Sequence, residues 1–344
     1  MKRIILYPCG ESDTLFIKHL VKTYLDTNFV VISPEQWEKP DAGIYPNLIY
    51  STDYNKFMKD VNDIYILDKK EIQYMKKQII ELVNKASSHN KLVTFLSPFE
   101  EIGIESLHVK YIENFPFNFD SNRDKLYVPQ ATIIGLGKQI EDLDTSQHLF
   151  NLIEQFSKKG LNVVVISENN NCKLLNNYFK FPKNFLHEFP LFNSIKLLNS
   201  FIEELDNKYA PDIIFIDIPN SLIKFSNDIV DDYGVSSYII SQSITFDYFL
   251  FLGTLDVNFN ELIKKLSHVF EVRLNIKVDQ YLLVNKFLDI VDYSETKNIK
   301  YRNNDEKINA EPSHQTVKVI DEDFKYDLIV DECLKQLTAY LHIV

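Results

Sequence analysis

Residues 131–138 read ATIIGLGK, an apolar run that enters two glycines. Residues 146–159 follow with apolar side chains at helical spacing, and Gly160 comes directly after them, where helices commonly end. The apolar run 161–167 then predicts the next strand. Apolar strands that alternate with amphipathic helices are typical of a parallel sheet with helices on both faces. The sequence therefore predicts an α/β domain that begins near residue 126.

The same alternation of strands and helices occurs before this point in the chain. The stretch 115–125, which contains Pro116 and the polar run 120–125, separates the two patterns and reads as a linker. We therefore predict two parallel-sheet, three-layer α/β domains, at residues 1–118 and 126–344. The predicted strands are 3–7, 29–33, 49–50, 64–67, 92–96, 131–136, 161–167, 212–218, 235–241, 248–255, 272–278 and 316–320. The predicted helices are 13–25, 55–62, 70–88, 146–159, 193–209, 261–270 and 326–341, and the polar stretch 294–313 reads as a loop.

Charge and hydropathy exclude several classes of function. The chain of 344 residues has a net charge of −12 and a pI near 5.2, so it lacks the positive field that nucleic acids and anionic membranes attract. The lysines at 69–70 and 76–77 read as the solvated face of a helix. No apolar stretch approaches the ~18 residues of a membrane span, and the first residues do not form a signal peptide. We predict a cytoplasmic bacterial protein that binds neither nucleic acid nor membrane.

The cysteines are too few and too dispersed for a disulfide framework or a zinc site. Cys9, Cys172 and Cys333 lie far apart in the sequence and form no CxxC motif. Cys9 follows a predicted strand at the start of a helix, where a thiol can have a lowered pKa, but a small buried residue is the more common reading. The sequence predicts no metal and a reduced compartment.

Glycine is scarce, and this argues against a bound dinucleotide. The chain has 8 glycines, where an average share of ~7% would give about 24. Phosphate loops need glycine because their backbone amides must approach the phosphate without a Cβ in the way. The sequence GLG at 135–137 lacks the third glycine of the dinucleotide motif, and the turn at 7–10 has one glycine. We predict no cofactor.

The order of strand, glycine-containing turn and helix in the second domain is that of a P-loop fold. Residues 135–146, GLGKQIEDLDTS, lie where the phosphate loop would lie. A working loop reads GxxxxGK[ST], and its lysine reaches the terminal phosphates. If Thr145 and Ser146 supply the hydroxyls, Leu143 and Asp144 replace the glycine and the lysine. Lys138 is too far up the loop to substitute, and carboxylates would repel an anion: Glu141, Asp142 and Asp144.

Asp217 ends the apolar run DIIFID at 212–217, and Asn220 follows in the next turn. This is the place of the carboxylate that supports Mg²⁺ in P-loop enzymes. Open parallel sheets bind ligands outside the carboxyl ends of their strands. We therefore predict a ligand-binding site at this edge and assign no catalytic residue. The predicted site residues are Gly135, Gly137, Lys138, Thr145, Ser146, Asp217 and Asn220, with further polar residues at 168–171 and 241–243.

Taken in order, these features resemble the clostridial peptide maturation system proteins. The likeness rests on GLGKQIEDLDTS, on DIIFIDIPNS at 212–221, on FPKNF at 181–185 and on VSSYIISQSITFDYFLF at 235–251. The resemblance implies a Rossmann-like N-terminal domain and a degenerate P-loop-like C-terminal domain with a C-terminal extension. The wider kinship is with the nitrogenase-iron-protein class of P-loop folds.

The same resemblance implies an accessory protein encoded with radical-SAM-type enzymes that modify ribosomally made peptides. Its partner would be a precursor peptide or a peptide-modifying enzyme. Two alternatives remain open at this point. One is an ATP- or GTP-dependent enzyme with an atypical phosphate loop. The other is a small-molecule enzyme that uses Cys9 and Gly10 of the N-terminal domain.

Overall fold

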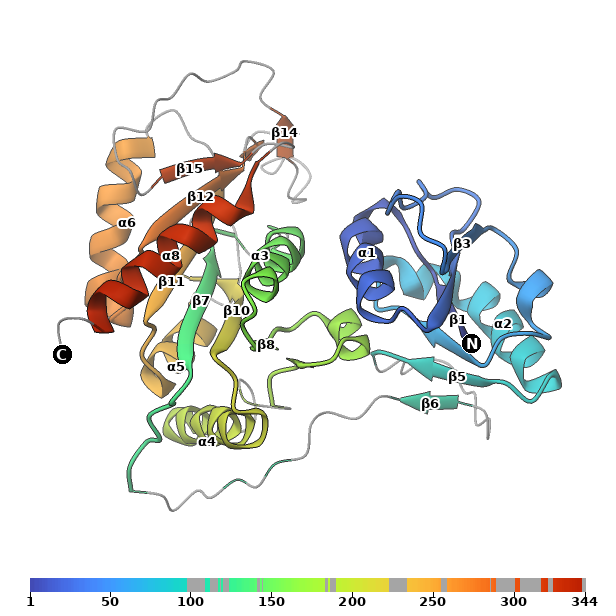
Figure 1. Cartoon of the computed structure of the whole chain (residues 1–344), viewed down its shortest axis with the longest axis horizontal. Helices are drawn as coiled ribbons and strands as arrows, with labels where there is room; N and C mark the ends of the chain where they lie inside the picture. Colours follow the sequence, from blue (N-terminus) through green and yellow to red (C-terminus); the bar gives the residue numbers. More distant parts are fainter. Residues whose placement is uncertain are drawn as a thin grey trace. The chain divides into compact units, whose positions relative to one another are not determined.

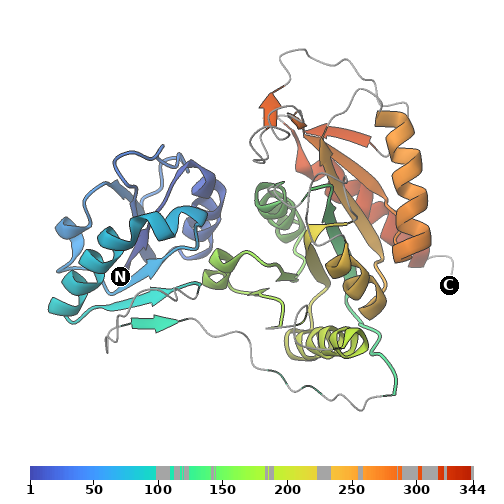
Figure 2. The same ribbon diagram turned by 180° about the vertical axis from the view of Figure 1, so that it is seen from behind.

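The computed structural model of the chain forms two compact units (Figures 1 and 2). The first unit is Met1–Phe115 with Asn169–Lys180, and the second is Pro116–Glu168 with Phe181–Val344. The stretch Asn169–Lys180, here called the inserted segment, falls within the predicted second domain yet packs with the first unit. The structure describes residues 1–97, 109–111, 117, 119, 124–140, 143, 145–182, 185, 190–222, 234–254, 259–284, 286–288, 301–303, 317–320 and 324–341.

The first unit is built on a six-stranded parallel sheet. Its strands are β1 (Lys2–Tyr7), β2 (Thr27–Ile32), β3 (Leu48–Ser51), β4 (Asp63–Ile66), β5 (Leu92–Phe95) and β6 (Val109–Tyr111). The strand order is β3-β2-β1-β4-β5-β6. This is the order 3-2-1-4-5-6 of doubly wound, Rossmann-like sheets, in which the direction of winding reverses between the first and fourth strands. The carboxyl ends of β1 and β4 therefore flank the position where such folds bind ligands.

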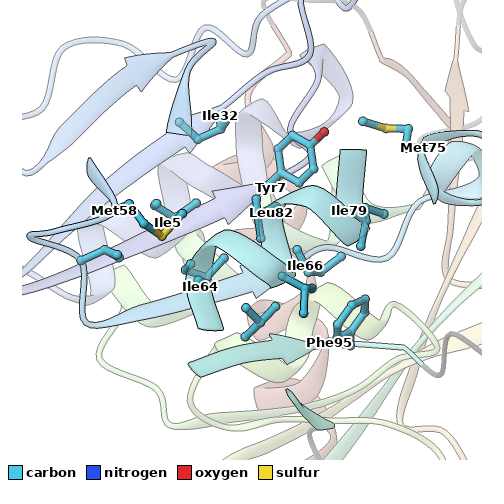
Figure 3. Packing of buried hydrophobic residues seen from close by; sticks show 14 of the residues in the cluster. Ile5, Tyr7, Ile32, Met58, Ile64, Ile66, Met75, Ile79, Leu82 and Phe95 are labelled. Carbon is cyan, nitrogen blue, oxygen red and sulfur yellow. The ribbon is translucent and has the colours of Figure 1, made fainter. Parts of the chain in front are cut away.

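Helices and short 3-10 turns cover both faces of this sheet. These elements are α1 (Thr14–Thr23), α2 (Lys76–Ser88), η1 (Glu11–Asp13), η2 (Tyr54–Phe57), η3 (Lys70–Met75) and η4 (Asn170–Leu174). Successive strand residues point to opposite faces, and Ile5 and Tyr7 belong to the same buried cluster as Ile79 and Leu82 of α2. Figure 3 shows this layer, with α2 lying across the sheet. On the opposite face, α1 buries Phe16, Ile17, Leu20 and Val21.

The inserted segment adds a second cover to the face that carries α1. Asn171 accepts a hydrogen bond from the backbone N–H of Asp68 (2.8 Å) and donates to the Asp68 carbonyl (3.3 Å). Asn170 donates to the Asp68 carboxylate at 2.7 Å. The Tyr24 hydroxyl donates to the Leu174 carbonyl at 2.9 Å. Residues far apart in the sequence thus complete one layer of the first unit.

The second unit is built on a seven-stranded parallel sheet in the order β15-β12-β11-β7-β10-β8-β9, whose edge strand β9 is formed by residues of the inserted segment. Its strands are β7 (Thr132–Lys138), β8 (Val163–Ile166), β9 (Tyr178–Phe179), β10 (Ile213–Ser221), β11 (Tyr248–Thr254), β12 (Gln280–Val284) and β15 (Val317–Ile320). A separate antiparallel pair is formed by β13 (Lys286–Leu288) and β14 (Tyr301–Asn303). Both sheets and their covering helices confirm the predicted α/β fold with two parallel-sheet, three-layer domains.

The helices of the second unit divide between the faces of its sheet. They are α3 (Ser146–Lys158), α4 (Leu191–Tyr209), α5 (Val235–Ser243), α6 (Phe259–Leu274) and α8 (Tyr326–Leu341). On one face α3 packs against α8, and Phe156 of α3 lies against Phe215 of β10. On the other face α5 packs between α4 and α6, and Phe270 of α6 lies against Phe251 of β11. Figure 1 shows α3 and α8 on the same side of the sheet.

Two predicted strands of the second unit are wrong. Residues 235–241 belong to α5, because β10 and β11 are parallel members of one sheet and need a crossover connection between them. Residues 272–274 are the last turn of α6, and the strand that follows starts at Gln280 rather than at 272. Predicted helix 55–62 is reduced to the 3-10 turn η2. The expected loop at 294–313 lies largely outside the described residues. Its described part, residues 301–303, is the strand β14.

Candidate functional site

The predicted site residues of the second unit divide into two groups. Lys138, Asp217 and Asn220 lie at the carboxyl edge of the sheet, as expected. Lys138 ends β7 opposite Ser221, and its carbonyl accepts a hydrogen bond from the backbone N–H of Leu222 at 3.0 Å. Asp217 is buried, and its Oδ2 accepts a hydrogen bond from Ser167 Oγ at 2.7 Å. This edge therefore combines a lysine with a carboxylate held by a hydroxyl.

Asn220 connects this edge to the start of α5. Its backbone has a φ of 59°, a left-handed conformation that asparagine tolerates better than most residues. Its side-chain amide donates to Ser236 Oγ at 3.0 Å. Ser237, also buried, donates its hydroxyl to the Ser221 carbonyl at 3.1 Å. Hydroxyls at the start of α5 thus fix the turn that follows β10.

Gly135 and Gly137 serve packing rather than anion binding. A Cβ on Gly135 would lie 2.6 Å from ring atoms of Phe249, and one on Gly137 would lie 2.7 Å from Leu222. Both glycines lie within β7, and large side chains fill the space that their missing Cβ atoms leave. The sequence predicts that these glycines contact a ligand. In the structure, Phe249 and Leu222 lie against them instead.

The turn between β7 and α3 is closed by buried side chains. Ile140 is fully buried and Leu143 is 5% exposed. Gln139 Oε1 accepts hydrogen bonds from the backbone N–H of Thr254 (2.8 Å) and from its hydroxyl (3.2 Å). Thr145 is buried, and Ser146 begins α3. The described side chains of this turn therefore pack inward, and the predicted carboxylates at positions 141, 142 and 144 lie outside the described residues.

Large apolar side chains are exposed where α4 and α5 begin. Leu191 and Phe192 are 46% and 60% exposed, and Val235 and Tyr238 are 49% and 39% exposed. The two helices pack together, with Asn199 Nδ2 donating to the Ser243 carbonyl at 2.9 Å. Because α5 follows the carboxyl end of β10, its exposed residues lie at the same edge as Asn220. The edge therefore offers apolar as well as polar side chains to a ligand.

The first unit has a second place of interest, at the turn that follows β1. The carboxylate of Asp13 accepts a hydrogen bond from the Gly10 backbone N–H at 2.8 Å and pairs with Lys69 at 2.5 Å. The side chains of Asp13 and Lys69 are 4% and 12% exposed. A carboxylate of the chain itself thus occupies the position where Rossmann-like folds receive a phosphate.

This arrangement corrects one expectation and confirms another. Lys69 was expected on a solvated face, but it lies beside the η3 turn in a largely buried ion pair. Cys9 is fully buried, burial raises its pKa well above the usual value, and its thiol donates to the Leu6 carbonyl at 3.4 Å. The preferred reading of Cys9, a small buried residue, is therefore confirmed, and the alternative of a lowered pKa is wrong. Asp13 and Lys69 are 56 residues apart and match no motif, so the sequence offered no signal for them.

Within the described ranges, no three His, Cys, Asp or Glu side chains come close enough to hold a metal ion. The three cysteines form no disulfide, and all three are buried. None of the helices in the described part of the chain has the length and apolar character needed to cross a membrane.

Comparison with known proteins extends the description of the fold. No family model and no curated protein sequence matches the chain. Among solved structures, the chain is similar to a DUF1611 family protein from Anabaena variabilis ATCC 29413, with a TM-score of 0.51 and 9% sequence identity. The match covers 82% of this chain and 88% of that chain. At this identity the likeness concerns the fold alone, and it extends over most of both proteins.

Proposed function

We propose that this protein binds a peptide or a peptide-modifying enzyme and does not hydrolyse nucleotides. In this proposal it is a cytoplasmic accessory protein for the maturation of a ribosomally synthesised peptide. The observation that carries the proposal is the closed turn after β7. Ile140 and Leu143 are buried where a P-loop would expose backbone amides to phosphate, and Leu222 and Phe249 fill the space beside the two glycines.

Electrostatic considerations also weigh against phosphoryl transfer. The transferred phosphoryl group needs a lysine and a metal ion to balance its negative charge. Leu143 and Asp144 stand at the glycine and lysine positions of the motif. The remaining lysine of the edge, Lys138, belongs to the strand rather than to the start of α3. This supports a binding function for the edge in place of catalysis.

The exposed groups at this edge suit a peptide. Peptides offer backbone carbonyls and amides together with apolar side chains. Lys138 and Asn220 provide hydrogen-bonding groups, while Val235 and Tyr238 of α5 provide exposed apolar side chains, and aromatic rings such as that of Tyr238 are enriched in protein interfaces.

Calorimetry with Mg-ATP and Mg-GTP tests the first part of the proposal. We expect no binding tighter than ~10 μM, which corresponds to about −7 kcal/mol. A tighter complex or measurable hydrolysis would support the alternative, an ATP- or GTP-dependent enzyme with an atypical phosphate loop.

Pull-down from the native host, followed by binding measurements with the recovered peptide or enzyme, tests the second part. Tyr238→Ser and Lys138→Ala should weaken that binding at least tenfold. Asn220→Gly removes the amide but keeps the left-handed backbone permissible, so it should weaken binding without unfolding the turn. Leu328→Ser, a change at an exposed leucine of α8, is the matched control. Equal binding by all four variants would place the interaction elsewhere.

A further inference from the structure

A cavity of about 190 Å³ lies within the first unit, on the sheet face that carries α1. Its floor is apolar and comes from four different parts of the unit. The floor residues are Ile4 and Leu6 of β1, Leu20 of α1, Phe29 of β2 and Leu174 of the inserted segment. The first four are all less than 9% exposed. For comparison, an apolar cavity of ~150 Å³ lined by Leu, Ile and Phe stays dry and binds benzene.

One side of this cavity is polar. Lys2, Tyr24, Thr27 and Tyr65 complete its lining. Lys2 pairs with Asp63 at 2.7 Å and is about half exposed, so the ammonium keeps further N–H groups for a ligand. The Tyr24 hydroxyl is engaged with the Leu174 carbonyl. Among the polar groups of the lining, the Lys2 ammonium can only donate, while the hydroxyls of Thr27 and Tyr65 can each donate or accept.

Tyr65 adds a further donor beside the lysine. Burial, and then the negative charge of Asp63, raises the pKa of the Tyr65 hydroxyl, so it remains protonated at neutral pH. A group that accepts hydrogen bonds and carries one negative charge matches this rim. A more highly charged group such as a phosphate matches less well, because Asp63 already balances the charge of Lys2.

We propose that this cavity binds a small monocarboxylate with an aromatic or branched aliphatic body. The body would occupy the floor between β1, α1 and Leu174, and the carboxylate would lie against Lys2 and Tyr65. This site belongs to the first unit and is independent of the peptide-binding edge. Because Leu174 forms part of the floor, the bound ligand would also hold the inserted segment against the sheet.

Phenylacetate is a suitable probe, with phenylacetamide as its uncharged counterpart. Titration of the full chain by ligand-observed NMR should show saturable binding of phenylacetate and weaker binding of phenylacetamide. Lys2→Met keeps the apolar stem but removes the charge, and it should weaken phenylacetate binding about tenfold, the order expected for a hydrogen bond to a charged group. The same variant should change phenylacetamide binding less than threefold. Lys22→Met, a change at an exposed lysine of α1, is the matched control and should have no effect.

A second variant tests the cavity itself. Leu174→Phe should fill the floor and abolish binding of both probes, and because Leu174 is only partly buried the change should leave the fold intact. Binding should also slow cleavage of the chain within residues 169–180 by a protease. No saturable binding of phenylacetate to the unaltered protein, or binding that both Lys2→Met and Leu174→Phe leave unchanged, would overturn the proposal.

Discussion

The turn after β1 in the first unit and the turn after β7 in the second hold the same place in their folds. Each leads from the first strand of a parallel sheet into a helix, where nucleotide-binding relatives of these folds place a phosphate. In the first unit the turn is closed by charge, since Asp13 takes up the Gly10 N–H and is neutralised by Lys69. In the second it is closed by apolar volume, through Ile140 and Leu143.

The difference shows that groups of the chain itself can occupy one topological position in two physical ways. In the first unit, the Asp13 carboxylate accepts the hydrogen bond of the Gly10 N–H, which a phosphate could otherwise accept. The turn therefore has its hydrogen bond without a ligand. In the second unit, Ile140 and Leu143 are buried in the turn, and Phe249 and Leu222 fill the space beside the two glycines. The stability of the turn after β1 should therefore be sensitive to the loss of a charge. The stability of the turn after β7 should be sensitive to the addition of side-chain volume.

Lys69→Met should have the largest effect. It leaves the Asp13 carboxylate buried without its cation, which costs about 3–5 kcal/mol of the free energy of unfolding. The single tryptophan, Trp37, packs near Gly10 and reports on the first unit. Urea unfolding followed by tryptophan fluorescence should therefore show the shift.

The double variant Asp13→Asn with Lys69→Met is the control for this prediction. An asparagine at position 13 can still accept the Gly10 N–H but brings no charge into the interior, so the double variant should regain at least ~1 kcal/mol over Lys69→Met. A double variant less stable than Lys69→Met would mean that charge balance does not hold the turn.

Gly135→Ala should come next, with a loss of about 3 kcal/mol. The new Cβ would meet rigid ring atoms of Phe249 and Phe246 at 2.6–2.7 Å, and overpacking of this kind typically costs ~1–3 kcal/mol. Gly137→Ala meets the flexible Leu222 side chain and should cost about half as much. Circular dichroism during urea unfolding measures both. If Gly137→Ala were the more harmful change, packing against Phe249 would not be the reason for the glycine.

Asn171→Ala should have a smaller effect, of about 1–2 kcal/mol, because it removes hydrogen bonds to the buried backbone of Asp68. Tryptophan fluorescence should detect it, and a protease should cleave the inserted segment faster. Asn176→Ala, a change at an exposed position of the same segment, should stay within about 0.5 kcal/mol of the unaltered protein. Equal losses in the two variants would argue against a specific role for the Asp68 contacts.

The smallest expected signal is the reactivity of the cysteine thiols in the native protein. Cys9 lies beside the charged turn but is fully buried, and burial raises its pKa. Ellman's reagent at pH 8 should therefore react with none of the three cysteines of the native protein and with all three after unfolding. Rapid labelling of one thiol would show that the turn opens.

The fold class could be predicted because it depends on local patterns. The apolar runs 3–7 and 131–136 and the amphipathic helix 146–159 all keep their predicted type in β1, β7 and α3. Residues 235–241 were predicted wrongly because α5 buries serines and exposes Val235 and Tyr238, so its hydropathy does not follow the helical period. The helix is required instead by the crossover between β10 and β11, which only the topology reveals.

The candidate site could be predicted only in part. Lys138, Asp217 and Asn220 reach one edge because strand ends in a parallel sheet meet there, which sequence order alone implies. The packing role of Gly135 depends on Phe249, a contact across 114 residues. The pairing of Asp13 with Lys69 likewise depends on the order of β1 and β4 in the sheet. Such contacts are set by tertiary structure and leave no local pattern.

The inserted segment has a consequence for the protein during its synthesis. A ribosome that has translated the chain to Phe115 has made all six strands of the first sheet but not the layer that ends at Lys180. The 65 residues in between take roughly 3–13 s at ~5–20 residues per second. During this interval the sheet face around Tyr65 and the Asp68 backbone lack the contacts that the inserted segment provides. The first residues of the second unit have already been made by then. The nascent chain must therefore hold its first unit incomplete for seconds, and a fragment cut at the linker would remain so permanently.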